Sequence, residues 1–209
     1  MDSSNSKRIV DLHTAIRGLS VQNVVVFCAA CAERLLPNYV QFSQHERWGS
    51  PNSLRTILDR CWEMLIEDVI DKSELADRIL DVNRLTPHTE HFEFPFTGEA
   101  GDATNAIWCC LACLRDRNVE YGVEASQQCV ATADHYIRTR AFLDGYQLSD
   151  EAVYSHSLWI RELATQEKLI ELLRKSSSPS SADLQLIRQL SWNSGVSNVG
   201  LTWSGEVVH

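Results

Sequence analysis

Glycine is scarce in this chain, and so are the sequence motifs that depend on it. Only 9 of the 209 residues are glycine, and the chain contains no Gly-x-Ser-x-Gly, no Gly-x-x-x-x-Gly-Lys and no Gly-x-Gly-x-x-Gly. These patterns provide the nucleophile turn of hydrolases, the phosphate-binding loop and the dinucleotide-binding turn. An enzyme with this sequence would have to assemble its site from side chains that face a groove between helices.

Positive charge and long apolar runs are also limited. The 19 Lys and Arg residues are outnumbered by 28 Asp and Glu residues, which gives a net charge of −9, and no basic cluster is present. Because an acidic surface repels nucleic-acid phosphates and anionic lipid, we expect neither as a partner. The apolar runs 24–32 and 106–114 are too short to span a membrane, and the N-terminus lacks the apolar stretch of a signal peptide. We therefore predict a cytoplasmic protein.

The seven cysteines lie within apolar segments, which is typical of reduced, buried thiols. Cys28 with Cys31 and Cys110 with Cys113 have the Cys-x-x-Cys spacing of a tetrathiolate zinc site. Each pair falls inside a predicted helix, without the glycine or polar turn of a zinc knuckle, whereas a redox dithiol would lie at a helix N-terminus. We interpret these four residues as packing residues between two central helices, with a metal site as the alternative, and we expect no cofactor.

His88 and His91, together with Glu90 and Glu93, place nitrogen and oxygen ligands on one irregular segment. Such residues bind metal ions or act in catalysis when a loop positions them. The spacing alone is common, and no His-Glu-x-x-His motif is present. A solvated polar loop is the preferred interpretation, and a metal site is the alternative.

Helical periodicity dominates the chain, and only the C-terminal residues alternate apolar with small or polar side chains. We predict a single all-α domain over residues 1–209, a bundle of about eight helices. Residues 1–6 are expected to be disordered, residues 176–181 to form a Ser/Pro linker, and the tail after residue 195 to pack in an extended form. Two segments that are apolar nearly all round, residues 20–36 and 102–115, are expected to form the central helices.

The helix boundaries are predicted from the positions of capping residues and prolines. Pro37 is expected to end the first central helix and to begin a short helix that bends away from it. Ser50 and Pro51 predict the start of an amphipathic helix, and Asp102 is expected to cap the second central helix. The other helices are predicted over residues 7–19, 37–46, 51–69, 73–82, 123–143, 150–175 and 181–193.

Charged and polar residues around the predicted bend are the main candidates for a functional site. They are Glu33, Arg34, Asn38, Tyr39 and Glu63, which could line a helical groove. Glu33 lies near a predicted helix C-terminus, where the dipole favours cations, so it requires a compensating partner. Adjacent helical residues diverge by about 100°, so Glu33 and Arg34 are expected to pair with different helices. The preferred interpretation is structural, with the charged pair fixing the bend at Pro37.

Three segments carry a recognisable pattern. They read Cys-Ala-Glu-Arg-Leu-Leu-Pro-Asn-Tyr-Val-Gln-Phe at 31–42, Leu-Arg-Thr-Ile-Leu-Asp-Arg-Cys-Trp-Glu at 54–63 and Ser-Asn-Val-Gly-Leu at 197–201. They resemble the YjaG-like family of bacterial proteins, domain of unknown function 416, over nearly the whole chain. The resemblance implies an all-α fold without assigned activity, and an association with histidine kinases. It supplies no catalytic residue.

The missing catalytic motifs, the acidic surface and this resemblance favour a protein that acts by binding another protein, in regulation or signalling. One alternative is an enzyme or small-ligand binder that uses the groove near Glu33, Arg34, Asn38, Tyr39 and Glu63. Another is a toxin-immunity protein, for which an acidic surface is suitable.

Overall fold

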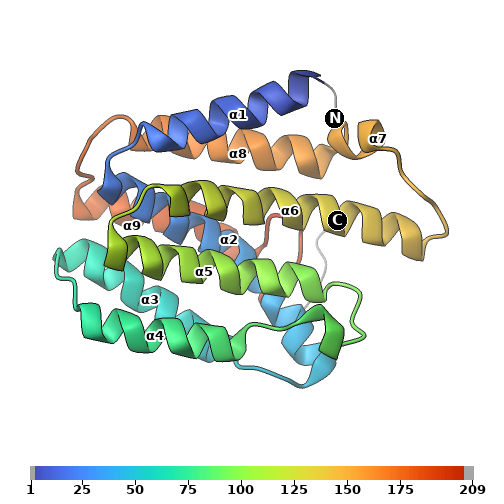
Figure 1. Cartoon of the computed structure of the whole chain (residues 1–209), viewed down its shortest axis with the longest axis horizontal. Coiled ribbons are helices and arrows are strands. Elements are labelled where there is room, and N and C mark those ends of the chain that lie inside the picture. The colour runs from blue at the N-terminus through green and yellow to red at the C-terminus, as the bar shows by residue number, and fades with distance from the viewer. Residues whose placement is uncertain (1–2, 205–209) are drawn as a thin grey trace.

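A computed structural model describes residues 3–204 of the chain. This range contains nine α-helices and two 3₁₀ turns (Figure 1). They are α1 Ser3–Arg17, α2 Val21–Glu46, α3 Pro51–Glu67, α4 Lys72–Leu85, η1 Thr89–His91, α5 Thr97–Asp116, α6 Glu120–Leu143, α7 Asp150–Tyr154, α8 Ser157–Leu173, α9 Ser181–Trp192 and η2 Asn193–Gly195. Within it, β-type pairing is limited to an isolated bridge between Val196 and Thr202. The predicted all-α bundle is confirmed.

Helix α2 runs through the centre of the bundle. Every residue from Asn23 to Val40 is buried, and α3, α5, α6, α8 and α9 pack around the helix. The second central helix, α5, packs along α2, and α6 in turn lies beside α5 (Figure 1). Burial on all sides is what an all-round apolar pattern predicts. Over residues 3–204, neither α2 nor any other helix combines the length and apolar character needed to cross a membrane.

The predicted break at Pro37 is wrong. Helix α2 continues through this buried proline to Glu46. Because proline has no N–H, it cannot donate to the carbonyl of Glu33 one turn earlier. The C-terminal segment packs at this point, and the N–H of Asn198 donates to the carbonyl of Arg34 at 3.1 Å. Packing on all sides therefore outweighs the local preference of proline to begin a new helix.

Two predicted helix starts are also wrong. Helix α5 begins at Thr97, so Asp102 lies in its second turn, where its carboxylate accepts a hydrogen bond from the Thr132 hydroxyl at 2.8 Å instead of capping the helix. Helix α1 begins at Ser3, so residues 3–6 are helical and not disordered. Residues 1–2 lie outside the described range. In both cases the helix extends further towards the N-terminus than its apolar pattern does.

The helix predicted over residues 150–175 is in fact two helices. Helix α7 ends at Tyr154, and α8 starts at Ser157 after a short turn. The imidazole of His156 caps α8 by accepting the N–H of Leu158 at 3.2 Å. Histidine is not among the usual N-cap residues, so this boundary could not be predicted from capping preferences.

The serine caps are confirmed. Ser20 caps α2, and Ser50 caps α3 with Pro51 in the first turn. Ser180 forms a capping box with Asp183 at the start of α9. These residues satisfy N–H groups that a helix leaves without partners at its N-terminus.

The C-terminal residues pack on the bundle as a narrow loop. The N–H of Ser197 donates to the carbonyl of Leu201 at 2.7 Å, and the N–H of Trp203 donates to the carbonyl of Gly195 at 2.8 Å. Val199 and Leu201 are buried. The tail therefore packs against the helices as expected, but it closes on itself instead of lying extended.

Candidate functional site

Glu33 and Arg34 are consecutive on α2, and both are buried, with 1% and 6% of their surface exposed. The carboxylate of Glu33 pairs with α3 and α9, whereas the guanidinium of Arg34 pairs with α8. The expectation that the two residues pair with different helices is confirmed. They are therefore the centres of two separate polar clusters.

The Glu33 cluster comprises Glu33, Arg55, Asp59, Trp62 and Arg188. Arg55 donates to both carboxylate oxygens of Glu33, from Nη1 at 2.5 Å and Nη2 at 2.8 Å. Trp62 Nε1 donates to Oε1 at 2.8 Å, and Arg188 Nε donates to it at 3.3 Å. Asp59 pairs with both arginines. Each carboxylate oxygen of Glu33 is thus satisfied.

The Glu33 cluster joins α2, α3 and α9. Burial opposes the charged form of Arg55, but the hydrogen bond and charge of Glu33, with help from Asp59, outweigh it and raise the pKa of Arg55. Cation–π contacts add to the packing, because Arg55 lies over the ring of Trp192 and Arg188 over that of Trp62. With its charges paired and its oxygens occupied, the cluster acts as a structural junction.

The Arg34 cluster comprises Arg34, Cys31, Cys129, Glu162 and Gln166. Arg34 donates to Glu162 from Nη2 at 2.9 Å and from Nη1 at 3.3 Å. Nη2 also lies 3.3 Å from the sulfur of Cys129 and 3.7 Å from that of Cys31. Gln166 Nε2 donates to Glu162 at 2.8 Å and so helps to hold the carboxylate.

Arg34 and Arg55 share one feature. The Nε of each is buried and has no hydrogen-bond partner among the described residues. Burial opposes the charged form of Arg34, but the charge of Glu162 and the neighbouring thiols outweigh burial and raise the pKa of Arg34. Arg34 is therefore a permanent cation with unused hydrogen-bonding capacity.

A groove formed by two adjoining cavities lies beside Arg34. The cavities have volumes of about 320 Å³ and 360 Å³, at the small end of the range of about 300 to 1,000 Å³ typical of ligand pockets. Both are lined by Arg34, Arg161, Thr165 and Leu190. We call this feature the α8–α9 groove, because residues of these two helices form most of its walls.

Three cations line the α8–α9 groove, namely Arg34, Arg161 and Lys168. Arg161 donates from Nη2 to the carbonyl of Asn198 at 2.8 Å, and over residues 3–204 neither Arg161 nor Lys168 forms an ion pair. The carboxylate in the lining, Glu162, is already bound by Arg34. The groove is thus locally positive in a chain of net charge −9.

Sequence reasoning identified Arg34 but missed Arg161 and Lys168. The two residues are seven apart, which places them on one face of a helix with Thr165 between them. That spacing is the only signal in the sequence, and every amphipathic helix with a charged outer face has it. The position of α9 across this face turns ordinary surface residues into the lining of a groove.

The other predicted site residues do not gather in one place. Asn38 Nδ2 donates to the side-chain carbonyl of Asn198 at 3.4 Å, and its own Oδ1 is buried without a partner in the described residues. The Tyr39 hydroxyl donates to a backbone carbonyl at the end of α4 at 2.9 Å, and burial raises its pKa to about 12. Glu63 lies on the surface, paired with Arg60 at 3.1 Å. The structure therefore does not bring Glu63 to Glu33.

All seven cysteines are free and buried. Cys28 of the first Cys-x-x-Cys pair lies beside Cys113 of the second, whereas Cys110 lies beside Cys61 and Cys31 beside Cys129. The two pairs therefore meet at one thiol each. In the part of the chain that the structure describes, no three His, Cys, Asp or Glu side chains are placed to hold a metal ion.

His88 and His91 lie on the exposed connection between α4 and α5, around η1. Their rings are 5.9 Å apart in an edge-on arrangement. Glu90 and Glu93 are exposed as well, and no third ligand joins them among residues 3–204. This geometry is that of a solvated polar loop.

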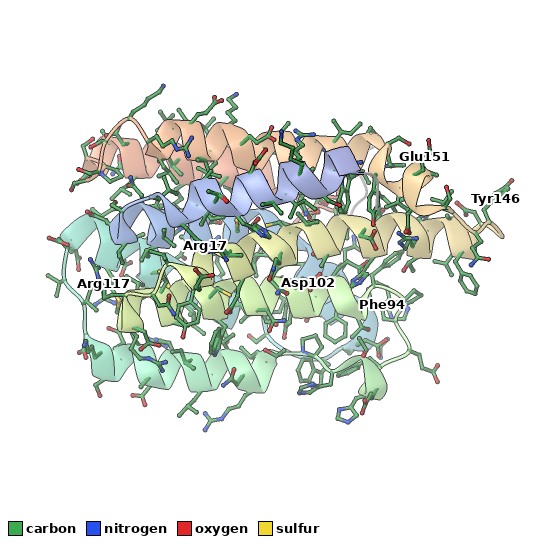
Figure 2. The ribbon with its side chains drawn as sticks, turned by 45° about the horizontal axis from the view of Figure 1, so that its top comes forward. Arg17, Phe94, Asp102, Arg117, Tyr146 and Glu151 are labelled. Atoms are coloured by element: carbon green, nitrogen blue, oxygen red, sulfur yellow. The ribbon has the colours of Figure 1, made fainter. Side chains whose placement is uncertain are left out.

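Two buried acids on α5 were not anticipated as a pair. Glu99 is buried with its Oε1 unpartnered within the described range, and burial raises its pKa to about 8. Burial also raises the pKa of Asp102 to about 7, against the opposing effect of its hydrogen bond with Thr132. Figure 2 shows Asp102 on α5 within the bundle. Reading Asp102 as a helix cap concealed this pair.

Known proteins resemble this chain over nearly its full length. The model of a family described as a protein of unknown function, DUF416, matches residues 11–202. The uncharacterized protein YjaG of Escherichia coli K12 is 27% identical over 195 residues, which cover 91% of this chain and 95% of that protein. YjaG of Salmonella typhimurium is 24% identical over 197 residues, covering 92% and 96%.

A solved structure shares the fold. The crystal structure of a DUF416 family protein from Shewanella baltica OS155 matches with a TM-score of 0.80 and 24% identity, covering 91% of this chain and 97% of that one. The resemblance seen in the sequence is therefore confirmed, and the chain belongs to the DUF416 family of proteins of unknown function.

Proposed function

We propose that the protein binds a small anionic ligand in the α8–α9 groove. The observation that carries this proposal is the presence of Arg34, Arg161 and Lys168 at one cavity of an acidic protein. The carboxylate in the lining, Glu162, already pairs with Arg34. An incoming anion would therefore meet positive charge that the described residues leave unpaired.

The chemistry of the three cations suits an anion. A guanidinium presents several N–H donors in a plane that matches carboxylate and phosphate oxygens. Arg161 is held at one N–H by the carbonyl of Asn198, which restricts its side chain while leaving other donors available. Burial of Arg34 lowers the dielectric constant around its guanidinium and strengthens its attraction for an anion, whereas Arg161 and Lys168 are exposed and add charge that solvent screens.

The lining favours binding over catalysis. Among residues 3–204, no histidine or cysteine lines the two cavities. The Thr165 hydroxyl donates to the carbonyl of Arg161 at 2.8 Å, and Glu162 is engaged by Arg34. A nucleophile with an adjacent free base, which covalent catalysis requires, is thus absent from this lining.

Two-dimensional NMR titrations with inorganic phosphate and with butanoate test the proposal. We expect saturable shifts of amides near Arg161 and Thr165 that weaken as salt is raised. Joint replacement Arg161→Gln and Lys168→Gln should abolish these shifts. The matched control replaces an arginine and a lysine of α4, Arg84→Gln and Lys72→Gln, and should leave them unchanged. Shifts that survive the groove replacements would refute the proposal.

The protein-binding role predicted from the sequence, in regulation or signalling, stays a prediction, as does the toxin-immunity alternative. The surface to examine for it is the end of α6 and the connection after it, where Phe142, Leu143 and Tyr146 are exposed by 76%, 51% and 69%. Figure 2 shows Tyr146 projecting at the tip of this connection. Scattered exposed apolar residues are normal on proteins, so this surface carries less weight than the groove.

A further inference from the structure

The two halves of the α8–α9 groove differ in chemistry. One half is walled by aliphatic side chains: Ala164, Leu169, Leu172, Ile187 and Leu190. The other half is bordered by polar groups: Glu162, Asn193, Ser197 and Asn198. Arg34 and Arg161 line both cavities, so the cations lie where the apolar half meets the polar half.

The aliphatic half is open to solvent along α9. Leu190 is 56% exposed, and Leu186, one turn earlier on the same helix, is 52% exposed. Leu169 and Ile187, by contrast, are buried and form the wall behind. An apolar channel with an exposed edge, directly beside unpaired cations, is a surface that an amphipathic molecule would cover.

Lys168 adds to this arrangement. It lines the aliphatic cavity and is absent from the lining of the polar one. A lysine can lay its methylene stem along apolar surface while its ammonium group stays in water. Lys168 can therefore cover an aliphatic chain and still contribute positive charge near the head group.

We infer that the ligand of the α8–α9 groove is an aliphatic chain with a single anionic head group, such as a straight-chain carboxylate. The head group lies against Arg34 and Arg161, and the chain runs between α8 and α9 over Leu169, Leu190 and their neighbours. This inference rests on the proposed anion-binding function and extends it by adding the apolar half of the groove.

Calorimetric titration with straight-chain carboxylates from butanoate to dodecanoate, each below its micelle concentration, tests the inference on the intact protein. We expect affinity to rise about fourfold for each added methylene, which corresponds to about 0.8 kcal/mol. The rise should stop when the apolar half is filled. The corresponding alkyl phosphates should follow the same trend, and the alcohols should bind at least tenfold more weakly.

A surface variant identifies where the aliphatic chain of the ligand binds. Leu190→Gln replaces an exposed side chain, so the fold should tolerate it. It should reduce the affinity for decanoate about tenfold more than the affinity for butanoate. The matched control is Leu80→Gln on α4, where the side chain is 53% exposed and distant from the groove lining. It should change neither affinity.

The experiments distinguish a failure of the aliphatic-chain inference from a failure of the anion-binding proposal. Affinity that does not depend on chain length, but that Arg161→Gln still weakens, would refute the aliphatic chain and leave anion binding intact. Alcohols that bind as well as carboxylates would refute anion binding instead. A dependence on chain length that is equal in wild type and in Leu190→Gln would overturn the inference, because the chain would then bind elsewhere.

Discussion

The Glu33 cluster and the Arg34 cluster begin at neighbouring residues of α2 and have opposite characters. Glu33 is surrounded by Arg55, Arg188 and the indole of Trp62, and both of its oxygens are occupied. Arg34 pairs with one carboxylate and borders two cavities, and its Nε, like that of Arg55, is without a partner in the described structure. The first cluster is closed by protein groups, whereas the second borders open space.

The difference shows how burial alone fails to separate structural from functional charges. Both residues are almost fully buried, so exposure does not distinguish them. What distinguishes them is the space beside them: protein donors enclose the oxygens of Glu33, whereas Arg34 borders two cavities. A buried charge needs pairing and hydrogen bonds, and a charge whose partners are incomplete beside a cavity is suited to an external ligand.

The strongest test of the closed cluster is Glu33→Gln. The change keeps the shape but leaves the guanidinium groups of Arg55 and Arg188 with only Asp59 as a carboxylate partner. Breaking a buried pair from one side is costly, so we expect a loss of about 3 to 5 kcal/mol in the free energy of unfolding. Urea denaturation measures it. A loss below about 1 kcal/mol would mean that the cluster is not a structural junction.

Arg34→Met tests the open cluster, with an expected loss of about 2 to 3 kcal/mol, because Glu162 keeps its hydrogen bond from Gln166. The double change Arg34→Met with Glu162→Leu should recover most of this stability, since it removes both charges. Butanoate binding should be lost in both variants. Recovery of binding together with stability in the double variant would show that Arg34 serves folding alone.

Glu99 extends the comparison to a buried carboxylic acid that forms no ion pair with an arginine or lysine within residues 3–204. Its pKa is raised to about 8 in the folded protein, against an ordinary value of 4.5. Between these pH values the unfolded chain releases a proton that the folded chain retains, so this group lowers stability as pH rises through that window. Between pH 6 and pH 8 the wild type should therefore lose about 2 kcal/mol more stability than Glu99→Gln. Urea unfolding at both pH values measures this, and parallel losses would contradict it.

The smallest expected effect concerns Lys168→Gln. Lys168 is exposed and forms no ion pair within residues 3–204, so the urea midpoint should not change. Butanoate affinity should fall about threefold, as expected for one exposed charge near an anion. Lys72→Gln on α4 is the matched control. An equal effect of both changes would attribute the loss to net charge and not to the groove.

The fold could be predicted where local signals and packing agree. Ser50 and Pro51 mark the start of α3, and Ser180 with Asp183 marks α9, because these side chains satisfy the first N–H groups of the helix. Pro37 misled the prediction, because its effect depends on neighbours that the sequence does not place. His156 was missed because it is an unusual cap.

The candidate site was predictable only in part. Arg34 stands out because it interrupts an apolar helix, and the divergence of adjacent side chains anticipated its separation from Glu33. Arg161 and Lys168 could not be identified, since their significance depends on α9 lining the same groove as α8. Glu63 was grouped with Glu33 from the predicted helix packing, but it lies on the outer face of α3, beside Arg60.

The long-range partners of α2 have a consequence for how the protein is made. Arg34 pairs with a residue 128 positions later in the chain, and Glu33 with one 155 positions later. Arg55 follows Glu33 by only 22 positions, but during synthesis the central helix leaves the ribosome long before the partner of Arg34. Until α8 and α9 have emerged, a nascent chain exposes an apolar helix with an unpaired arginine, and such exposed surface promotes aggregation and chaperone binding. We expect the native bundle to form late in translation, after residue 188 has been added.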